Sequence, residues 1–406
     1  MISLPVYKYT AMTKSGDKTE STYTANSETE VLAMLRDSGH FPIKVQEMVE
    51  KKEISLGDIF NKVKTKDIAI FCRQFYTMLN AGVTIVNCLD ILRHQTENKK
   101  LRKVIGDVYE DVQKGLTLSE ALKKHKKTFP SLFINMVEAG ELSGTLDTVM
   151  NRMATHYEKE YKINNKIKGA MVYPIILSIV AIGVVIFLLT FVMPTFMGMF
   201  TGSGVELPWP TKILLSISDW LQSYWYIFIG ALLILIVGLG YYGKTDNGRF
   251  IIDNMKLKIP VVKNTSEKVI TSRFTRTLST LLVSGVPLID ALEIVSKVVN
   301  NKVVEKKMNS VKEEVQKGAS LSKPVKNTGV FPPMVDSMIE IGEESGSLDD
   351  ILDRTANFYD EEVETAIQKM TTMLEPIMIV VMAVIIGFIV IAMALPMFDM
   401  VNTVEM

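Results

Sequence analysis

Hydrophobic and polar positions alternate every second residue at the start of the chain. Three stretches have this pattern: residues 6–11, 19–25 and 42–48. Alternation of this kind is typical of strands, and the turn signal at 14–17 separates the first two stretches. Ser27 followed by Glu30 forms a capping box, which predicts a helix that Gly39 ends. The pattern therefore predicts a small ββαβ domain at 1–48.

Beyond residue 66 the apolar spacing changes to the helical period. A first stripe consists of Ile68, Phe71, Phe75, Met78 and Leu79. Thr84 is placed to cap a second helix, and Gly115 ends a third. Two short helices are predicted at 118–125 and 130–139. Ser143 is then expected to cap a long sixth helix, so that 67–169 forms a bundle of six helices.

Three long stretches contain no charged residue. They lie between Lys168 and Glu206, between Asp219 and Lys244, and between Glu375 and Asp399. Each exceeds the roughly 20 apolar residues that span a bilayer as a helix. The expected transmembrane helices are 170–194, 221–243 and 376–396. The remaining boundaries are a linker at 49–66, an extracytoplasmic loop at 195–220, a linker at 244–269, a second helical repeat at 270–375 and an extracytoplasmic tail at 397–406.

The chain contains an internal duplication. Residues 71–119 align with 274–322 with 19 identities in 49 positions, and 129–174 align with 331–376 with 16 identities in 46. Each copy is a helical segment followed by one span, so both copies have the same orientation in the membrane. The span at 221–243 returns the chain to the side where the second copy begins. The fold class predicted is a mainly α, polytopic membrane protein with two tandem six-helix cytoplasmic bundles.

Basic residues indicate the orientation. Lysine and arginine cluster before the first span and after the second, whereas none follows the third. By the positive-inside rule, the N-terminus and residues 244–369 are cytoplasmic and the C-terminus is extracytoplasmic. The formal net charge is zero, with 45 basic and 45 acidic residues, which gives no indication of nucleic-acid binding. No cleaved signal peptide is expected, and Cys72 and Cys88 are interpreted as buried thiols.

The stretch GLGYYGKT, residues 238–245, matches both a P-loop and a dinucleotide-binding pattern. A P-loop needs a buried strand before it and a helix start after it. Here a membrane span precedes the stretch, and the following DNGRF is interpreted as a turn. We therefore expect no nucleotide site. The four histidines match no zinc spacing, so no catalytic residue, metal or cofactor is predicted, and the chain is not expected to be an enzyme.

One acidic segment occurs in both copies, as EAGELSGTLD at 138–147 and EIGEESGSLD at 340–349. Glu138 and Glu141 share a helical face, as do their equivalents Glu340 and Glu343. Three interpretations stay open: a helix–turn–helix connection, a surface for a basic partner, or a cation site. Glu375, at the edge of the third span, has either an interfacial position or a role in a proton relay, and an acid there is also placed to pair with another membrane helix.

The tandem repeats, the GV pair near the start of each, the VEAGELSGTL segment and the YP pair before the first span resemble the PilC/GspF family. These proteins are the inner-membrane platforms of type IV pilus and type II secretion machines, and the resemblance covers essentially the whole chain. The second copy departs from the pattern with Glu375-Pro376 in place of Tyr173-Pro174.

The resemblance implies a non-enzymatic platform in the inner membrane, commonly oligomeric and here a dimer. Its partners would be a hexameric assembly or retraction ATPase, pilins or pseudopilins, inner-membrane alignment proteins and the lipid bilayer. The expected partner-binding residues are Glu138, Glu141, Glu340 and Glu343, and the expected pilin contacts are Pro174, Glu375 and Pro376.

The function predicted is a type IV pilus platform that couples ATPase movement to the insertion or extraction of pilins. Two alternatives to this function stay open. The first is the equivalent platform of a type II secretion system. The second, from another class, is an oligomeric small transporter that uses Glu375 and the proline-containing spans as its pathway.

Overall fold

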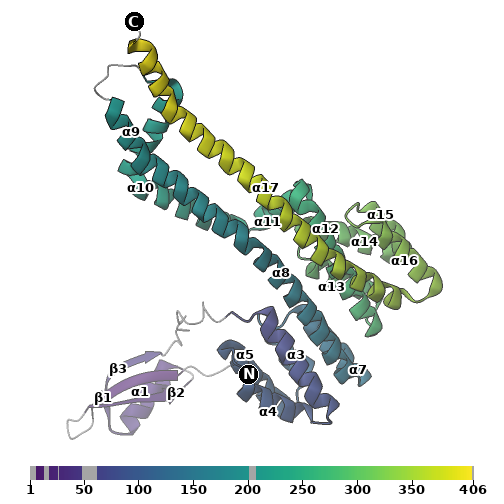
Figure 1. Cartoon of the computed structure of the whole chain (residues 1–406). Helices are drawn as coiled ribbons and strands as arrows, with labels where there is room; N and C mark the ends of the chain where they lie inside the picture. Colours follow the sequence, from purple (N-terminus) through teal and green to yellow (C-terminus); the bar gives the residue numbers. More distant parts are fainter. Residues whose placement is uncertain (1–5, 13–17, 26, 48–61, 201–206, 405–406) are drawn as a thin grey trace. The chain divides into compact units, whose positions relative to one another are not determined.

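The computed structural model describes residues 6–12, 18–25, 27–47, 62–200 and 207–404. The chain divides into two compact units, residues 1–62 and 63–406 (Figure 1). Each unit has its own buried core and is described by itself.

The N-terminal unit is a three-stranded antiparallel sheet with one helix. Its elements are β1 (Val6–Met12), β2 (Lys18–Thr24), α1 (Glu28–Asp37) and β3 (Phe41–Glu47), with strand order β2-β1-β3. Val31 and Leu35 of α1 pack with Tyr7 and Ala11 of β1 in a small core. Ser27 accepts a hydrogen bond from the backbone N–H of Glu30, as predicted. The expected turn at 14–17 and most of the linker at 49–66 lie outside the described residues.

Six helices represent the first copy of the duplication. They are α3 (Thr65–Asn80), α4 (Ile85–Gln95), α5 (Lys99–Gln113), α6 (Leu118–Lys123), α7 (Ser131–Ser143) and α8 (Leu146–Phe187). Thr84 caps α4 through the backbone N–H of Asn87. Gly82 and Gly115 have positive φ angles of 82° and 92°, which a glycine adopts without steric cost.

The second copy has the corresponding helices. They are α12 (Pro260–Val283), α13 (Leu288–Val298), α14 (Lys302–Gln316), α15 (Ser322–Asn327), α16 (Pro333–Ser345) and α17 (Leu348–Val404). Buried side chains of both copies form one continuous apolar cluster. It includes Phe71 and Phe133 of the first copy and Phe274 and Phe331 of the second. Both copies thus contribute to one apolar cluster, and the division into two tandem six-helix bundles stays a prediction.

The first residues of α8 differ from the prediction. Ser143 is the last residue of α7, and its hydroxyl donates to the carbonyl of Ala139 instead of capping α8. Gly144 then adopts the left-handed conformation with φ 70°, and α8 begins at Leu146. The serine–glycine pair thus ends one helix, whereas it was expected to start the next.

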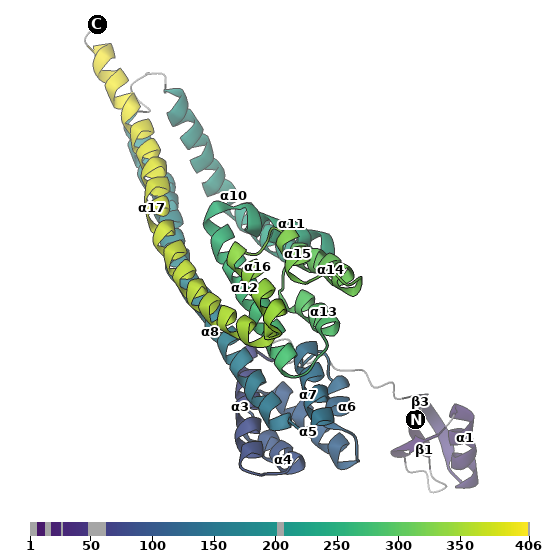
Figure 2. The same cartoon turned by 90° about the vertical axis from the view of Figure 1, so that its right-hand side faces the viewer.

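The helices α8 and α17 run in the same direction and contact each other over part of their length (Figures 1 and 2). Continuous helix from Leu146 to Gly198 and from Leu348 to Phe398 is long and apolar enough to cross a membrane. In the most apolar window of each, only 6% and 11% of the residues are buried, so neither is the core helix of a soluble protein. Both continue through the prolines at 174 and 376 without a break.

Along the chain, α10 (Trp209–Tyr242) comes between these two helices. It begins inside the range expected as a loop and has non-helical dihedrals at Tyr224. It packs on a π-helical turn, η1 (Leu188–Val192), which α9 (Met193–Phe200) continues. Side chains of α10 donate to carbonyls of its neighbours: Ser218 to Leu189 at 2.6 Å, Gln222 to Thr190 at 3.3 Å and Thr211 to Ala392 at 2.5 Å. A π-turn disturbs the regular backbone ladder, so such external donors matter most in an apolar surrounding.

The segment after residue 245 is also different from the prediction. It forms the helix α11 (Asp246–Lys258), where DNGRF was interpreted as a turn. Thr245 is the N-cap, and its hydroxyl accepts a hydrogen bond from the backbone N–H of Gly248 at 3.2 Å. The residues 246–258 therefore belong to a helix, although the sequence analysis placed them in a linker.

The close packing of α7 on α8, and of α16 on α17, predicts a large effect of one added methyl group. A Cβ on Gly140 would lie 2.9 Å from Val149 Cγ2, and a Cβ on Gly342 would lie 2.9 Å from Leu348 Cα. Gly140→Ala and Gly342→Ala are each expected to lower the free energy of unfolding by about 1–3 kcal/mol. Gly106→Ala is the control, since that Cβ meets nothing within 4 Å, and it should stabilise α5 by about 0.5–1 kcal/mol. Thermal unfolding of the detergent-solubilised chain would measure all three, and equal effects would contradict the packing argument.

Candidate functional site

The repeated acidic segment connects helices inside each copy. The Glu141 carboxylate accepts the backbone N–H groups of Leu118 and Ser119, the first residues of α6, at 2.6 and 2.9 Å. In the second copy Glu343 accepts from Leu321 and Ser322 at the start of α15 in the same way. A carboxylate there satisfies helix N–H groups that have no partner in the helix and interacts favourably with the helix dipole. Glu141 and Glu343 are therefore committed to the fold.

The other two predicted acids differ between the copies. Glu138 forms an ion pair with Lys123, 2.6 Å from Nζ to Oε1. Its equivalent Glu340 is exposed, and within the described residues it makes no hydrogen bond or ion pair. The segment thus does not gather its four acids into one site. Across the described residues, no three His, Cys, Asp or Glu side chains are grouped as a metal ion would require.

An arginine in each copy ties the first helix to the long helix. Arg73 of α3 donates to Asn151, Thr155 and Glu158 of α8, and the Arg73–Glu158 ion pair measures 2.7 Å. The equivalent Arg276 of α12 donates to Asp353, Asn357 and Asp360 of α17. These six partners occupy equivalent positions of the duplication. Sequence reasoning missed this network, although the alignment of Arg73 with Arg276 contained the signal.

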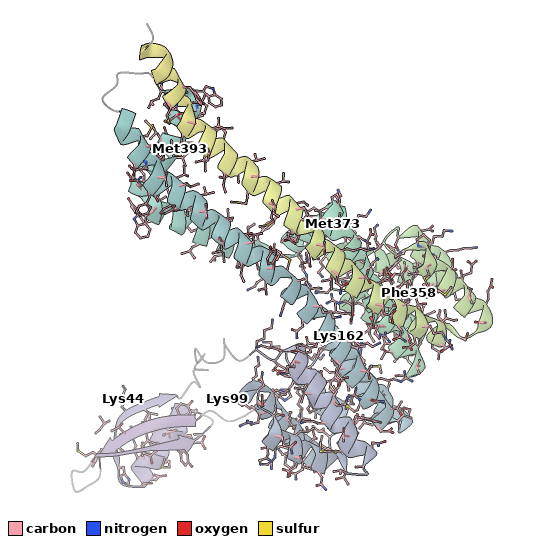
Figure 3. The ribbon with its side chains drawn as sticks, in the orientation of Figure 1. Lys44, Lys99, Lys162, Phe358, Met373 and Met393 are labelled. Atoms are coloured by element: carbon pink, nitrogen blue, oxygen red, sulfur yellow. The ribbon has the colours of Figure 1, made fainter. Side chains whose placement is uncertain are left out.

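The two long helices are joined by ion pairs just before their apolar stretches begin. Lys162 Nζ lies 2.9 Å from Glu364 Oε1, and Lys166 forms a second ion pair with the same carboxylate. Both lysines lower the pKa of Glu364, Lys166 more strongly. Lys159 adds an ion pair with Asp360 at 3.1 Å. Lys162, labelled on α8 in Figure 3, is therefore part of a charged contact between the copies.

The predicted membrane-side residues lie further along the same contact. The Tyr173 hydroxyl donates to Glu375 at 3.4 Å, which joins α8 to α17. Of the two prolines, Pro174 is buried in the structure and Pro376 is exposed. The structure thus brings Glu375 next to Tyr173, its own equivalent in the first copy.

A buried histidine lies where the copies meet. His156 of α8 is 5% exposed, and its Nδ1 has no hydrogen-bond partner in the structure. It lines a polar cleft of about 300 Å³ together with Arg152 of α8 and Arg276 of α12. Burial lowers the His156 pKa to about 4, and the positive charges of Arg276 and Arg273 contribute in the same direction. This position was not singled out from the sequence.

The chain atoms of the GLGYYGKT stretch themselves cover the start of the helix that follows it. The Thr245 hydroxyl donates to the carbonyl of Tyr242 at 2.6 Å. The carbonyl oxygen of Tyr242 would lie only 2.0 Å from a Cβ on Gly248, so it closes over the first turn of α11. The helix start is therefore covered by the preceding chain, and the element before it is the helix α10. A P-loop instead presents its N–H groups to phosphate after a strand.

Comparison with known proteins matches both copies and the N-terminal unit. Residues 71–194 and 274–396 match the family described as type II secretion system (T2SS), protein F. Residues 4–46 match the N-terminal domain of that family. The type IV pilus assembly protein PilC of Thermus thermophilus is 40% identical over 405 residues, covering 99% of this chain and 100% of that protein. PilC of Myxococcus xanthus is 38% identical, covering 98% and 96%. The type II secretion system protein F of Aeromonas hydrophila is 35% identical, covering 94% and 99%.

The buried His156 predicts a pH dependence of stability. Its folded pKa of about 4 lies below the ordinary histidine pKa of 6.5, so the unfolded state binds the proton more readily. The stability from the neutral imidazole is fully present above pH 6.5 and is lost as the pH falls toward 4, by up to about 3 kcal/mol. His156→Phe, which copies the equivalent Phe358, should reduce this loss. Unfolding midpoints of both proteins between pH 7 and 5 would measure it, and equal slopes would contradict the assignment.

Proposed function

Because the chain belongs to the type II secretion system protein F family, we propose that it is the inner-membrane platform of a type IV pilus assembly machine. In this role it couples a cytoplasmic hexameric ATPase to the insertion and extraction of pilin subunits. Family members are structural platform proteins, and the chain has the apolar helices of a membrane protein. The proposal concerns the type of machine, the partners and the coupling.

The names of the relatives favour a pilus over secretion. Three proteins named type IV pilus assembly protein PilC are 38–40% identical to the chain. Three proteins named type II secretion system protein F are 31–35% identical over similar lengths. The secretion platform remains the second candidate function, supported by the same family match.

The proposed topology has three spans, with α10 as the second. Two spans that run in the same direction need a return segment between them, and α10 connects the end of α9 to α11. Its described side chains between Leu233 and Tyr242 are exposed and apolar. Basic residues cluster after α10, and none follows the third expected span at 376–396. Both observations support a cytoplasmic N-terminus and an extracytoplasmic C-terminus.

The observation that carries the coupling proposal is the continuity of α8 and α17. Each helix begins in the shared core and continues without interruption into its exposed apolar stretch. Arg73 and Arg276 hold the cytoplasmic part of each helix to its own copy, and Glu364 holds the two helices to each other. A displacement of the cytoplasmic core is therefore transmitted along both helices to the membrane.

We place the ATPase contact on the outer face of α16. This face exposes Met334, Glu340 and Ile341, and Glu344 lies one turn after Glu340. The equivalent of Met334 in the first copy, Leu132, is buried, so the two copies expose different apolar positions on this helix. Acidic residues around apolar ones suit a partner surface with basic and apolar side chains. On the membrane side we retain Glu375 and Pro376 as the pilin contact, since both are exposed.

Reversal of the charge at Glu364 tests the coupling. Glu364→Lys places three positive charges together with Lys162 and Lys166, so the contact between α8 and α17 should open. We expect a loss of surface pili in a deletion strain that carries this variant at normal protein levels, measured by electron microscopy and shear-released pilin. A strain without the gene should lack pili altogether, and pili on that strain would contradict the proposed function.

A matched variant separates the ion pairs from a general loss of folding. Lys162→Glu and Lys166→Glu combined with Glu364→Lys restore opposite charges across the two helices. This triple variant should recover pili in part, because side-chain geometry differs after the exchange. If neither the single nor the triple variant changed pilus number, the paired helices would not transmit the movement. Loss of secreted protein with intact pili would instead favour the secretion platform.

The two glutamates of α16 should respond differently to substitution. Glu340→Lys is expected to weaken binding of the purified ATPase hexamer without changing thermal stability, because Glu340 is exposed and makes no side-chain hydrogen bond or ion pair within the described chain. Glu343→Gln removes a charged cap from α15 and should lower the free energy of unfolding by about 1–2 kcal/mol. Binding of the solubilised protein to the ATPase hexamer would measure the first effect, and thermal unfolding would measure the second. Normal ATPase binding by Glu340→Lys would rule out this contact.

A further inference from the structure

The helix α11 has one face that nothing in the described chain covers. Phe250, Ile251, Met255 and Ile259 are 39%, 48%, 53% and 43% exposed. Ile251, Met255 and Lys258 are spaced i, i+4 and i+7, which places them on one side of the helix. We call the set Ile251, Met255, Lys258 and Ile259 the α11 outer face. It is an exposed apolar stripe that includes one basic residue.

The opposite side of α11 is fastened to the second copy. Asp253 is 3% exposed, and its carboxylate accepts the backbone N–H of Lys302 at the start of α14 at 3.0 Å. The same carboxylate forms an ion pair with Lys256 at 2.9 Å. With 100° per residue, Ile251 and Met255 lie across the helix from Asp253. The contacts of α11 therefore orient its apolar stripe away from the soluble core.

The position of α11 identifies what this face meets. Three residues separate the end of α10 at Tyr242 from the start of α11 at Asp246, and Figure 2 shows α11 at the end of α10. The exposed residues Leu233–Tyr242 of α10 are apolar up to this point. A helix that starts where the proposed span ends lies at the depth of the lipid headgroups.

The charges around α11 match anionic lipids. Residues 244–263 contain Lys244, Arg249, Lys256, Lys258 and Lys263, against Asp246 and Asp253. Five positive and two negative charges leave a net charge of +3. Within the described chain, Lys244 and Lys258 form no ion pair, and Asp253 is buried in its own contacts. Apolar side chains next to such lysines are the pattern of helices that bind the surface of anionic membranes.

A cleft beside α11 extends this apolar surface. It has a volume of about 410 Å³ and lies between α11, α12 and the part of α8 where the charge-free stretch begins. Ile167, Met171 and Val262 line it, with Lys256 and Arg273 among its charged residues. Apolar walls with cations at the same level suit the upper part of a phospholipid with an anionic headgroup.

We propose that α11 is an interfacial helix that binds anionic phospholipids of the cytoplasmic leaflet through the α11 outer face and Lys244. This inference rests on the proposed topology, in which α10 crosses the membrane and ends on the cytoplasmic side. It assigns α11 the task of fixing the height and tilt of the second copy against the membrane surface, independently of α8 and α17.

The test measures the depth of single labels in the full chain. Cys72 and Cys88 are buried, and burial raises the pKa of both thiols, so an NBD maleimide labels an introduced cysteine selectively. Met255→Cys is the test position, and Ile234→Cys reports on α10. Leu142→Cys on α7 reports on the aqueous solvent, because Leu142 is 86% exposed. The labelled proteins are placed in nanodiscs of phosphatidylcholine with and without phosphatidylglycerol, and lipids with a spin label near the headgroup serve as quenchers.

The Met255 label is expected to shift its emission to shorter wavelength and to lose most of its fluorescence to the quencher, while the Leu142 label is unaffected. Phosphatidylglycerol should increase quenching at Met255, and Lys244→Glu with Lys258→Glu should remove that increase. A Met255 label that behaves like the Leu142 label, while the Ile234 label reports a membrane environment, would overturn the inference alone. An Ile234 label in water would overturn the topology on which it rests.

Discussion

The parallel, in-register contact between α8 and α17, at which Lys162 and Glu364 form an ion pair, is the constraint on which the arrangement of the two copies depends. Residues 162 and 364 are equivalent positions of the duplication. So are Tyr173 and Glu375, which meet about three helical turns further along the same two helices. Equivalent positions can face each other repeatedly only if the two helices run in parallel and in register around a shared axis. This geometry makes the apolar stretches of both helices leave the shared core in the same direction. In the proposed topology α10 then brings the chain back, because the second copy starts on the same side as the first.

Within this frame each copy is held to its long helix by charge-assisted hydrogen bonds. Arg73 and Arg276 contact equivalent positions on α8 and α17, but their surroundings differ. The side chain of Arg73 is 37% exposed, whereas that of Arg276 is 10% exposed beside Asp360, which also contacts Lys159 of the first copy. The network of the second copy therefore joins three elements, and that of the first joins two. Partly buried pairs are less screened by solvent and salt, so the junction of the copies is held more firmly than the outer helices.

The sequence predicted the duplication, the ββαβ order and the positions of most helices, because these depend on periodicity and on local signals such as Thr84 and Gly115. It failed where a local signal has two meanings. Asn247-Gly248 is typical of a turn, but Thr245 caps a helix there, and Ser143 is a typical cap although it ends α7. The partners of Glu141 and Arg73 lie far away in the chain, at Leu118 and Glu158. Such contacts depend on tertiary packing, which spacing alone does not determine.

The comparison between copies separates residues that build the repeat from residues available for function. Glu141 and Glu343 are identical and make the same contacts, so selection for the fold alone explains both. Glu138 and Glu340 are also identical, yet of these two only Glu138 has an ion-pair partner in the described chain, and the helix around Glu340 exposes Met334, whose equivalent Leu132 is buried. Tyr173 and Glu375 differ outright at the level where the helices enter their apolar stretches. In the proposed platform role both copies need to fold alike, but a single motor and a single fibre would require the copies to face different partners. The positions where equivalent residues have different surroundings are therefore where partner binding is to be sought.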